Sequence, residues 1–265
     1  MTSDNSLPLK GKVAIVTGST KGIGKGIAEA LSSSGANVVV TSRHIDDARD
    51  LAKRLSSEFE KSIGLQLDIE DRSTFSPLLE DILAEFGRLD ALVNNAFSHS
   101  GVPPLDVLDD QQVEFALTSN ITNTLLLTRK CLDALKESKG NVINISSVAA
   151  NRHLYGMPIY GIIKGAINHM TKALAAEWAQ DQIRVNAISP GFVYSSALTY
   201  FGVPEDVIAK HYEYCKQFHP LGRIGTPEDI GKLAAFVASD DAGFMTGSVI
   251  NSDAGYSIQG VKLPM

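Results

Sequence analysis

The residue pair that points most directly to chemistry is Tyr160 and Lys164, four positions apart at the start of a stretch with helical periodicity. Side chains at i and i+4 lie on one face of a helix. A tyrosine hydroxyl in water has a pKa of about 10. An ammonium about 5 Å away, at an effective dielectric constant of about 20, favours the phenolate by roughly 3 kcal/mol, or about two pKa units. The spacing therefore predicts a tyrosine that exchanges protons near neutral pH.

A hydroxyl group is available to join this pair, because Ser147 follows the apolar run 142–145 and precedes Tyr160. The same Tyr-x-x-x-Lys spacing recurs at Tyr212 and Lys216. A pattern this short also arises by chance. Only the first pair has a strand end and a hydroxyl placed to meet it, so we interpret the second as a solvent-exposed pair on a helix.

A glycine-rich loop lies between the first apolar run, 13–16, and the first helical stretch, 22–33. Its glycines let the backbone approach a pyrophosphate, and the N-terminus of the following helix offers unpaired N–H groups and a partial positive charge. This placement predicts dinucleotide binding, with a tight strand-to-helix turn as the alternative. The residues expected to contact the cofactor here are Gly18, Ser19, Thr20, Lys21, Gly22, Ile23 and Gly24.

The end of the second apolar run bears on which dinucleotide is bound. An acidic residue there commonly binds the ribose 2′-hydroxyl of NAD. This sequence has Ser42, Arg43 and His44 instead, and Lys21 lies in the glycine loop. Two cations and a hydroxyl suit a 2′-phosphate, so we expect NADP(H) rather than NAD(H).

Seven short, mostly apolar runs alternate with longer stretches of helical periodicity. Continuously apolar strands are typical of a parallel sheet covered by helices on both faces, and the alternation implies right-handed crossovers. We therefore predict an α/β fold of the Rossmann type, with a doubly wound, parallel, seven-stranded sheet in a single domain over residues 1–265. The runs are 13–16, 38–41, 65–67, 91–93, 142–145, 184–188 and 248–250; the helical stretches are 22–33, 71–86, 121–135, 162–178 and one that begins at Thr226-Pro227.

Residues from about 195 to 226 interrupt this alternation, because they contain no strand signal and are rich in tyrosine, phenylalanine and histidine. Long inserts in such folds are usually lids or binding loops. We expect a substrate loop here that favours a cyclic or apolar substrate. A contact between subunits is the alternative.

Composition and charge exclude several classes of protein. Of the 265 residues, 44% are hydrophobic and 20% charged, as in an ordinary globular protein. The net charge of −6 argues against nucleic acid or an anionic membrane surface as the partner. Two cysteines are too few for a disulfide framework, and no apolar run approaches the roughly 18 residues of a membrane span. Because the N-terminus also lacks a signal peptide pattern, we expect a cytoplasmic protein.

Two other kinds of catalytic site find no support in the sequence. The six histidines are scattered without metal-ligand spacing, so no metal is expected. The nucleophile turn G-x-S-x-G of serine hydrolases does not occur.

Taken together, the motifs resemble those of the short-chain dehydrogenase/reductase family from about residue 10 to residue 260. Their order and spacing carry the resemblance, since no single piece is decisive. The matching pieces are Thr17-Gly-Ser-Thr-Lys-Gly-Ile-Gly24, Asp68-Ile69, Asn94-Asn-Ala96, Asn120, Ile145-Ser-Ser147, Tyr160-Gly-Ile-Ile-Lys164 and Arg184-Val-Asn-Ala-Ile-Ser-Pro-Gly191.

The resemblance implies an oxidoreductase that transfers a hydride between NADP(H) and a ketone or secondary alcohol. Tyr160 would act as acid and base, and Lys164 would lower its pKa and bind the nicotinamide ribose. Ser147 would bind the substrate oxygen, and Asn120 would anchor a water that passes protons to Lys164. Asp68 would contact the adenine. The further cofactor contacts that it implies are Ile69, Asn94, Ala96, Pro190, Gly191, Val193 and Ser195.

Two positions near the expected site depart from the family pattern. Ser195 replaces the usual threonine, and Phe97 stands where glycine is general, so a bulky ring could reshape the floor of the site. The resemblance also implies a homo-oligomer, either a tetramer or a dimer. The residues expected to face a small-molecule substrate are Phe97, His99, Ser147, His153, Tyr160 and Tyr194.

Two other functions stay open on the sequence alone. One keeps the family but not the reaction: an epimerase or dehydratase that uses a bound nicotinamide. The other is a nucleotide-sensing binding protein without catalysis, against which the set Asn120, Ser147, Tyr160 and Lys164 weighs.

Overall fold

A computed structural model describes residues 7–56, 60–98, 104–195, 199 and 202–259. Seven parallel strands form one sheet in the order β3-β2-β1-β4-β5-β6-β7, which confirms the predicted doubly wound sheet. Each of the seven apolar runs overlaps one strand. The strands are β1 Val13–Val16, β2 Asn37–Ser42, β3 Ile63–Gln66, β4 Ala91–Asn94, β5 Asn141–Ile145, β6 Arg184–Pro190 and β7 Val249–Ser252.

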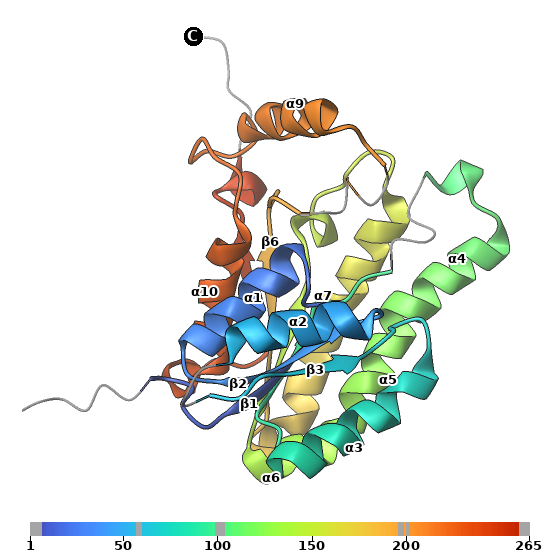
Figure 1. Cartoon of the computed structure of the whole chain (residues 1–265). Helices are drawn as coiled ribbons and strands as arrows, with labels where there is room; N and C mark the ends of the chain where they lie inside the picture. The colour runs from blue at the N-terminus through green and yellow to red at the C-terminus, as the bar shows by residue number, and fades with distance from the viewer. Residues whose placement is uncertain (1–6, 57–59, 99–103, 196–198, 200–201, 260–265) are drawn as a thin grey trace, which may run out of the picture.

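Helices cover both faces of the sheet (Figure 1). On one face pack α1 (Gly22–Ser33), α2 (Ile45–Leu55) and α10 (Pro227–Ala238). The opposite face carries α3 (Phe75–Phe86), α5 (Asn123–Lys130), α6 (Leu132–Ser138) and α7 (Pro158–Trp178). The remaining helices are α4 (Asp110–Leu117), which packs on α7, and α9 (Glu205–Lys216).

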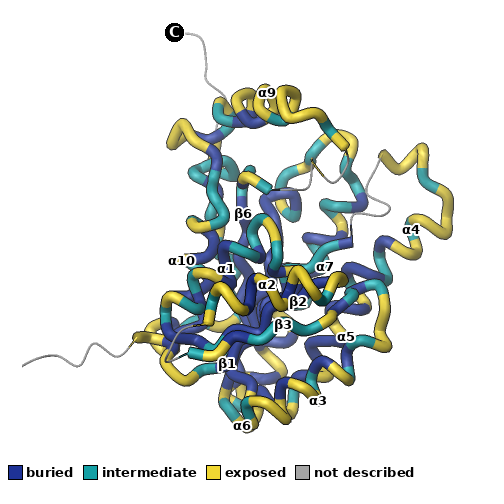
Figure 2. The backbone as a smooth tube through the Cα atoms, viewed as in Figure 1, coloured by how far each residue is buried: buried dark blue, intermediate teal, exposed yellow. Residues whose placement is uncertain are grey.

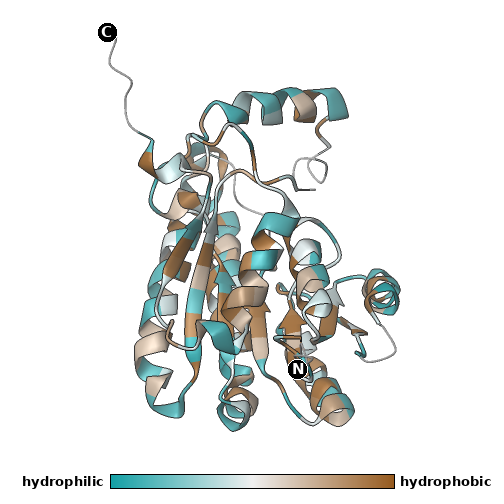
Figure 3. Ribbon diagram, turned by 90° about the vertical axis from the view of Figure 1, so that its left-hand side faces the viewer, coloured by the Kyte–Doolittle hydropathy of each residue, from teal (hydrophilic) through white to brown (hydrophobic). Residues whose placement is uncertain are grey.

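Strand β1 shows why the apolar runs form buried strands. Val13 and Ile15 enter the core on one face of the sheet, whereas Ala14 and Val16 enter the core on the other. All four residues are buried, so a period-2 alternation with polar residues would leave one core incomplete. Figures 2 and 3 show the result: buried, hydrophobic strands lie at the centre, and exposed polar surfaces lie on the outer sides of the helices.

The helices follow the prediction less closely than the strands. The predicted helix 22–33 is confirmed as α1. The predicted helix 121–135 is divided, because a π-helical turn spans Thr118–Thr122 and Cys131 separates α5 from α6. Helix α2 was not predicted from the sequence; it is largely charged and buries only Ala48, Leu51 and Ala52. That i, i+3, i+4 stripe was the available signal.

The strand order determines where a site can form. Strand β1 pairs with β2 on one side and with β4 on the other, so the chain reverses its direction of winding between β1 and β4. In open α/β sheets, ligands bind in the crevice outside the carboxyl ends of the strands at such a reversal.

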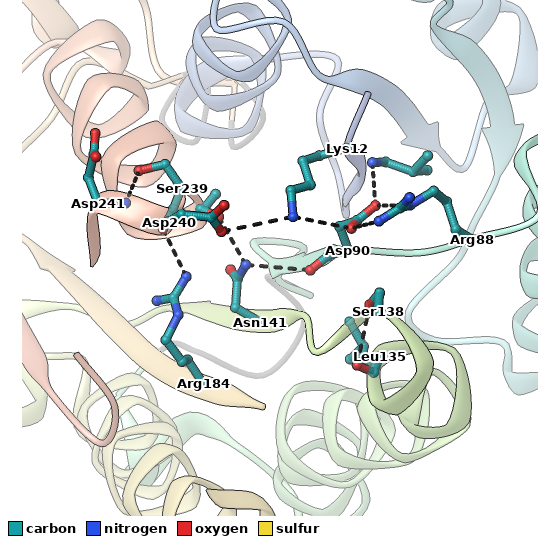
Figure 4. Close-up of polar contacts among 12 residues, drawn as sticks. Lys12, Arg88, Asp90, Leu135, Ser138, Asn141, Arg184, Ser239, Asp240 and Asp241 are labelled. Carbon is teal, nitrogen blue, oxygen red and sulfur yellow. Dashed lines mark hydrogen bonds and ion pairs between the residues drawn. The ribbon is translucent and has the colours of Figure 1, made fainter. Parts of the chain in front are cut away.

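At the amino ends of the central strands, opposite the crevice, lies a charged network around Asp90 (Figure 4). The buried Asp90 carboxylate accepts hydrogen bonds from the Val13 amide at 2.9 Å and from Arg88 Nε at 2.8 Å. Lys12 lies 3.8 Å away, and the Asp90 carbonyl accepts the Asn141 amide at 2.8 Å. These contacts join the amino ends of β1, β4 and β5, on the side of the sheet away from the crevice.

The predicted insert contains α9, and one prediction within it is wrong. Tyr212 is not solvent-exposed: only 8% of it is accessible, and its hydroxyl accepts the Ser195 amide at 3.0 Å and donates to the Ser195 carbonyl at 3.2 Å. Lys216 forms an ion pair with Glu213, its neighbour on the same helix. Tyr212 therefore attaches α9, which crosses the top of Figure 1, to the segment that follows β6.

None of the helices in the described part of the chain combines the length and hydropathy needed to cross a bilayer.

Candidate functional site

A cleft of about 630 Å³ lies at the carboxyl ends of β1 to β6. Its walls come from the loops that follow these strands and from the first two turns of α7. Most residues singled out from the sequence meet here. The predicted residues that line it are Gly18, Thr20, Lys21, Gly22, Ile23, Gly24, Ser42, Arg43, His44, Asp68, Ile69, Ala96, Phe97, Ser147, Tyr160, Lys164, Pro190, Gly191, Val193 and Ser195.

The glycine loop has the shape of a phosphate cradle. Gly18 adopts φ of +62°, and a Cβ at this position would lie 3.1 Å from the Ala96 Cα. A Cβ on Gly24 would lie only 2.4 Å from the Gly18 carbonyl oxygen, so the loop can fold this tightly only without side chains. Lys21 precedes α1 and makes no side-chain capping bond, so the first N–H groups of the helix face the cleft uncapped. These features fit a bound pyrophosphate.

Asn95, which follows the predicted cofactor contact Asn94, holds this loop in place. Its side-chain amide donates to the carbonyls of Thr17 at 2.9 Å and Gly18 at 3.1 Å. The Thr17 hydroxyl in turn accepts the amides of Asn95 and Ala96, both at 2.8 Å. Asn95 lines the cleft, and Asn94 does not.

Asn94 instead belongs to a buried polar chain that fixes α7 against the sheet. Its side-chain amide donates to Thr128 Oγ1 at 2.9 Å and to Asn144 Oδ1 at 2.8 Å. Asn144 then donates to Thr171 Oγ1 at 2.9 Å. These bonds join β4, β5, α5 and α7, and they are buried where unpaired amides would cost free energy. This series of buried hydrogen bonds therefore fixes the position of α7, whose first turns line the cleft.

Ser147, Tyr160 and Lys164 converge at one end of the cleft, as predicted. Tyr160 forms a side-chain hydrogen bond with Ser147. Lys164 is 7% exposed, and its ammonium donates to the Ile145 carbonyl at 2.8 Å. Lys164 Nζ also lies 5.7 Å from the centroid of the Tyr160 ring. A phenol, a hydroxyl and an ammonium thus share one desolvated corner.

The electrostatics of this corner differ from the prediction. Desolvation raises the pKa of Tyr160, and the hydrogen bond from Ser147 offsets part of that rise. Burial also lowers the pKa of Lys164 to about 8. The attraction between ammonium and phenolate that the i, i+4 spacing indicates is outweighed by the cost of taking each charge out of water. Tyr160 is therefore held in its protonated form.

Phe97 contacts both the Tyr160 ring and the Lys164 ammonium in this corner. Its ring meets the Tyr160 ring edge-to-face, with centroids 5.2 Å apart and an interplanar angle of 81°. Lys164 Nζ lies 4.9 Å from the Phe97 centroid, within the range of a cation–π contact.

Asn120 lies outside the cleft lining, in the π-helical turn Thr118–Thr122. Its Oδ1 accepts the Ser98 amide at 2.8 Å, and its Nδ2 donates to the carbonyls of Ser98 and Ala116, both at 3.0 Å. The side chain therefore clamps the loop that carries Phe97. The Asn120 carbonyl accepts the Thr124 hydroxyl at 2.9 Å.

The far end of the cleft carries the residues expected to select the cofactor. Arg43 and His44 are exposed there, and Ser42 Oγ accepts the His44 amide at 3.1 Å. Gln66 Nε2 donates to the Arg43 carbonyl at 3.2 Å, which fixes the backbone of this turn. Asp47, an acid in the first turn of α2, also lines the cleft and was not predicted from the sequence.

His219, in the insert, was also missed and supports the loop after β6. Its Nε2 accepts the Phe192 amide at 3.2 Å, so the hydrogen must be on Nδ1, which lies 2.9 Å from the Cys215 carbonyl. A Cβ on Gly191 would lie 3.0 Å from the same Nε2. No motif marks this residue, because the contact joins positions 27 apart in sequence.

Several predicted residues do not reach the cleft. The Ser19 hydroxyl is buried and accepts the Thr41 amide at 2.9 Å. His153 is exposed and packs against Tyr155, and Tyr194 packs against Tyr212 with centroids 4.7 Å apart. His99 lies outside the described residues. Within the described ranges, no group of three or more His, Cys, Asp or Glu side chains could hold a metal ion.

Comparison with known proteins identifies the family. The family model described as enoyl-(acyl carrier protein) reductase matches residues 18–257. The chain is 38% identical over 240 residues to an L-fucose dehydrogenase of Oryctolagus cuniculus, covering 89% of this chain and 82% of that protein. It is 34% identical to the 3-oxoacyl-(acyl-carrier-protein) reductase FabG of Haemophilus influenzae, covering 93% and 98%. The chain belongs to the short-chain dehydrogenase/reductase family.

A solved structure agrees with this assignment. A short-chain type dehydrogenase/reductase from Mycobacterium marinum superposes with a TM-score of 0.84 at 29% identity, covering 95% of this chain and 98% of that one. Members of the short-chain dehydrogenase/reductase family are oxidoreductases that use a nicotinamide cofactor. The glycine loop, whose close contacts leave no room for a Cβ, fits such a group.

Burial of Lys164 predicts a measurable dependence of stability on pH. Its pKa is about 8 in the folded protein and 10.5 ordinarily, so between these values the unfolded state binds the extra proton and stability rises with pH. From pH 8 to about 9.5, the free energy of unfolding should rise by about 2 kcal/mol more in the wild type than in Lys164→Met. Urea unfolding at several pH values measures this. Lys172→Met, an exposed position on α7, should keep the wild-type slope; equal slopes for Lys164→Met and wild type would contradict the buried ammonium.

Proposed function

We propose that this protein interconverts a ketone and a secondary alcohol with NADP(H), using Tyr160 as the acid and base. The observation that carries the proposal is the hydrogen-bonded pair of Tyr160 and Ser147 beside buried Lys164, in the same cleft as the glycine loop. Relatives named as a dehydrogenase and as an oxoacyl reductase support chemistry between an alcohol and a carbonyl group.

The residues of the corner divide the reaction between them. The nicotinamide, when bound, supplies or accepts the hydride. Ser147 donates a hydrogen bond that orients the substrate oxygen, and Tyr160 gives that oxygen its proton as negative charge develops. The raised pKa of Tyr160 keeps the proton available until this moment. The nearby Lys164 charge then stabilises the phenolate that remains.

The choice of NADP(H) rests on charge at the far end of the cleft. Lys21 and Arg43 both line the cleft, and both residues are exposed to solvent. Ser42 adds a hydroxyl next to them. The acids among the described lining residues are Asp47, in the first turn of α2, and Asp68 and Glu70, which follow β3. The two cations favour a phosphate over a free ribose hydroxyl.

The same proposal includes a single domain, a cytoplasmic location and assembly into a homo-oligomer. Exposed apolar residues on two neighbouring helices support assembly, since Leu125 on α5 and Ile162 on α7 are 38% and 57% exposed. The segment from Ser195 to Thr226 would act as the substrate loop, because Ser195 lines the cleft and Tyr212 holds it.

Removing the Tyr160 hydroxyl should abolish the reaction without preventing cofactor binding. We expect Tyr160→Phe to lower kcat/KM for ketone reduction by at least about 100-fold, the lower range for general acid catalysis. NADPH oxidation at 340 nm with a panel of carbonyl compounds measures the activity, and quenching of NADPH fluorescence measures binding. Tyr155→Phe, at a position 96% exposed and outside the cleft, is the matched control.

The outcomes of that experiment separate the alternatives. Product formation without net NADPH consumption would indicate an epimerase or dehydratase. Cofactor binding with no turnover of any compound by the wild type would favour a nucleotide-sensing protein. Full activity of Tyr160→Phe would show that another group is the acid.

Removing the Arg43 guanidinium should affect one cofactor selectively. We expect Arg43→Ala to weaken NADPH binding by about 1.5–3 kcal/mol, the loss of a hydrogen bond to a charged group, and to leave NADH binding nearly unchanged. Fluorescence titration of both cofactors measures this. Arg49→Ala, an exposed arginine of α2 outside the cleft lining, should change neither. Equal losses for NADPH and NADH would contradict a 2′-phosphate site.

A further inference from the structure

Phe97 is a fixed wall of the reactive corner. Its ring meets the Tyr160 ring edge-to-face, with the two centroids 5.2 Å apart, and its centroid lies 4.9 Å from Lys164 Nζ. It also packs against the apolar cluster that Ile159 and Ile163 form on the first turns of α7. Contacts on several sides leave the ring little rotamer freedom. The backbone beside it is clamped as well, because the Asn120 side chain binds both the amide and the carbonyl of Ser98.

The side of the corner formed by the segment after β5 is also apolar. The described cleft residues between positions 145 and 160 include Val148, Leu154 and Met157, and none of them carries a charge. Together with Phe97, these side chains add apolar surface to the cleft that holds Tyr160 and Ser147, and a nonpolar molecule can cover this surface.

Hydrogen-bonding groups for a substrate are few on this segment. On the described part of this segment, Ser146 Oγ donates to the Lys164 carbonyl at 3.3 Å, so Ser147 and Tyr160 are the polar side chains left to face a reacting oxygen. Ser98 and Glu70 also line the cleft, where the Ser98 hydroxyl donates to the Glu70 carboxylate at 2.6 Å. One carbonyl oxygen satisfies both Ser147 and Tyr160. Additional hydroxyl groups on a substrate would lose water here without gaining partners, and each such loss costs free energy.

We propose that Phe97 restricts the substrate to flat, uncharged, apolar ketones, such as aryl or planar cyclic ketones, and rejects ketones that are branched beside the carbonyl. A planar group can pass alongside the fixed ring and bring its oxygen to Tyr160 and Ser147. A tetrahedral, fully substituted carbon next to the carbonyl collides with the ring that occupies this space. The inference rests on the proposed carbonyl reduction and adds the substrate class and the residue that sets it.

The test compares ketones that differ in bulk but not in polarity. NADPH-dependent reduction of acetophenone, 1-indanone and the tert-butyl ketone pivalophenone is measured with wild type, Phe97→Ala and Phe97→Leu. We expect Phe97→Ala to raise the ratio of kcat/KM for pivalophenone to that for acetophenone by about tenfold or more, within the range of steric discrimination in apolar pockets. Phe97→Leu, which keeps apolar bulk and protects the fold, should give an intermediate ratio. Comparing ratios between variants cancels the different intrinsic reactivities of the ketones.

Controls keep the possible failures distinct. Phe244→Ala removes a fully exposed phenylalanine and should leave the ratio at the wild-type value. NADPH binding and thermal unfolding of each variant show whether it is folded. If no carbonyl compound is reduced by the wild type, the proposed function itself fails. If a branched or polyhydroxylated ketone is preferred by the wild type, or if the ratio is the same in Phe97→Ala, carbonyl reduction stands and the inference about Phe97 is overturned.

Discussion

The candidate site depends on how α7 is seated against β5. The Lys164 ammonium donates to the carbonyl of Ile145 at the end of that strand, and farther along the helix Thr171 accepts a hydrogen bond from Asn144. These two bonds set the rotation and the depth of the helix, and they bring Tyr160 to Ser147 at the loop that follows the strand. Both bonds are buried, so breaking either would leave an unpaired polar group in the core. The free-energy cost of such a group disfavours other positions of the helix.

The same burial governs the chemistry of the corner. Desolvation keeps Tyr160 protonated and brings the pKa of Lys164 to about 8, so both groups are shifted toward their neutral forms. A charge that develops on a substrate oxygen in such surroundings interacts strongly with the few dipoles that face it. Phe97 adds to this environment, since its ring excludes water and still offers its π face to the lysine ammonium. The two pKa shifts thus follow from one physical condition, the desolvation of the phenol and the ammonium.

The sequence predicted the strands well because the five central strands are almost entirely buried, so they form apolar runs that can be recognised without knowledge of the fold; the edge strands β3 and β7 are only partly buried. It predicted that Tyr160, Lys164 and Ser147 lie together, because residues i and i+4 share one face of a helix and Ser147 follows the end of a strand. Contacts between residues that are distant in the sequence could not be predicted from it. Asn94 and Asn95 are adjacent, yet one residue of strand register sends the first into the core and the second to the glycine loop. Tyr212 and His219 gain their partners only when the insert folds back on the segment after β6. The pKa of Tyr160 required the depth of burial, which spacing alone does not contain.

The central claim is that this corner directs a hydride from the cofactor to a carbonyl carbon while Tyr160 protonates the oxygen. The most direct measurement uses NADPH that carries deuterium at the transferring C4 position, with whichever ketone the protein turns over, and mass spectrometry of the alcohol product. The account predicts one deuterium atom on the carbinol carbon and one NADP⁺ formed for each alcohol. Product that contains no deuterium, or that forms without oxidation of the cofactor, would contradict it.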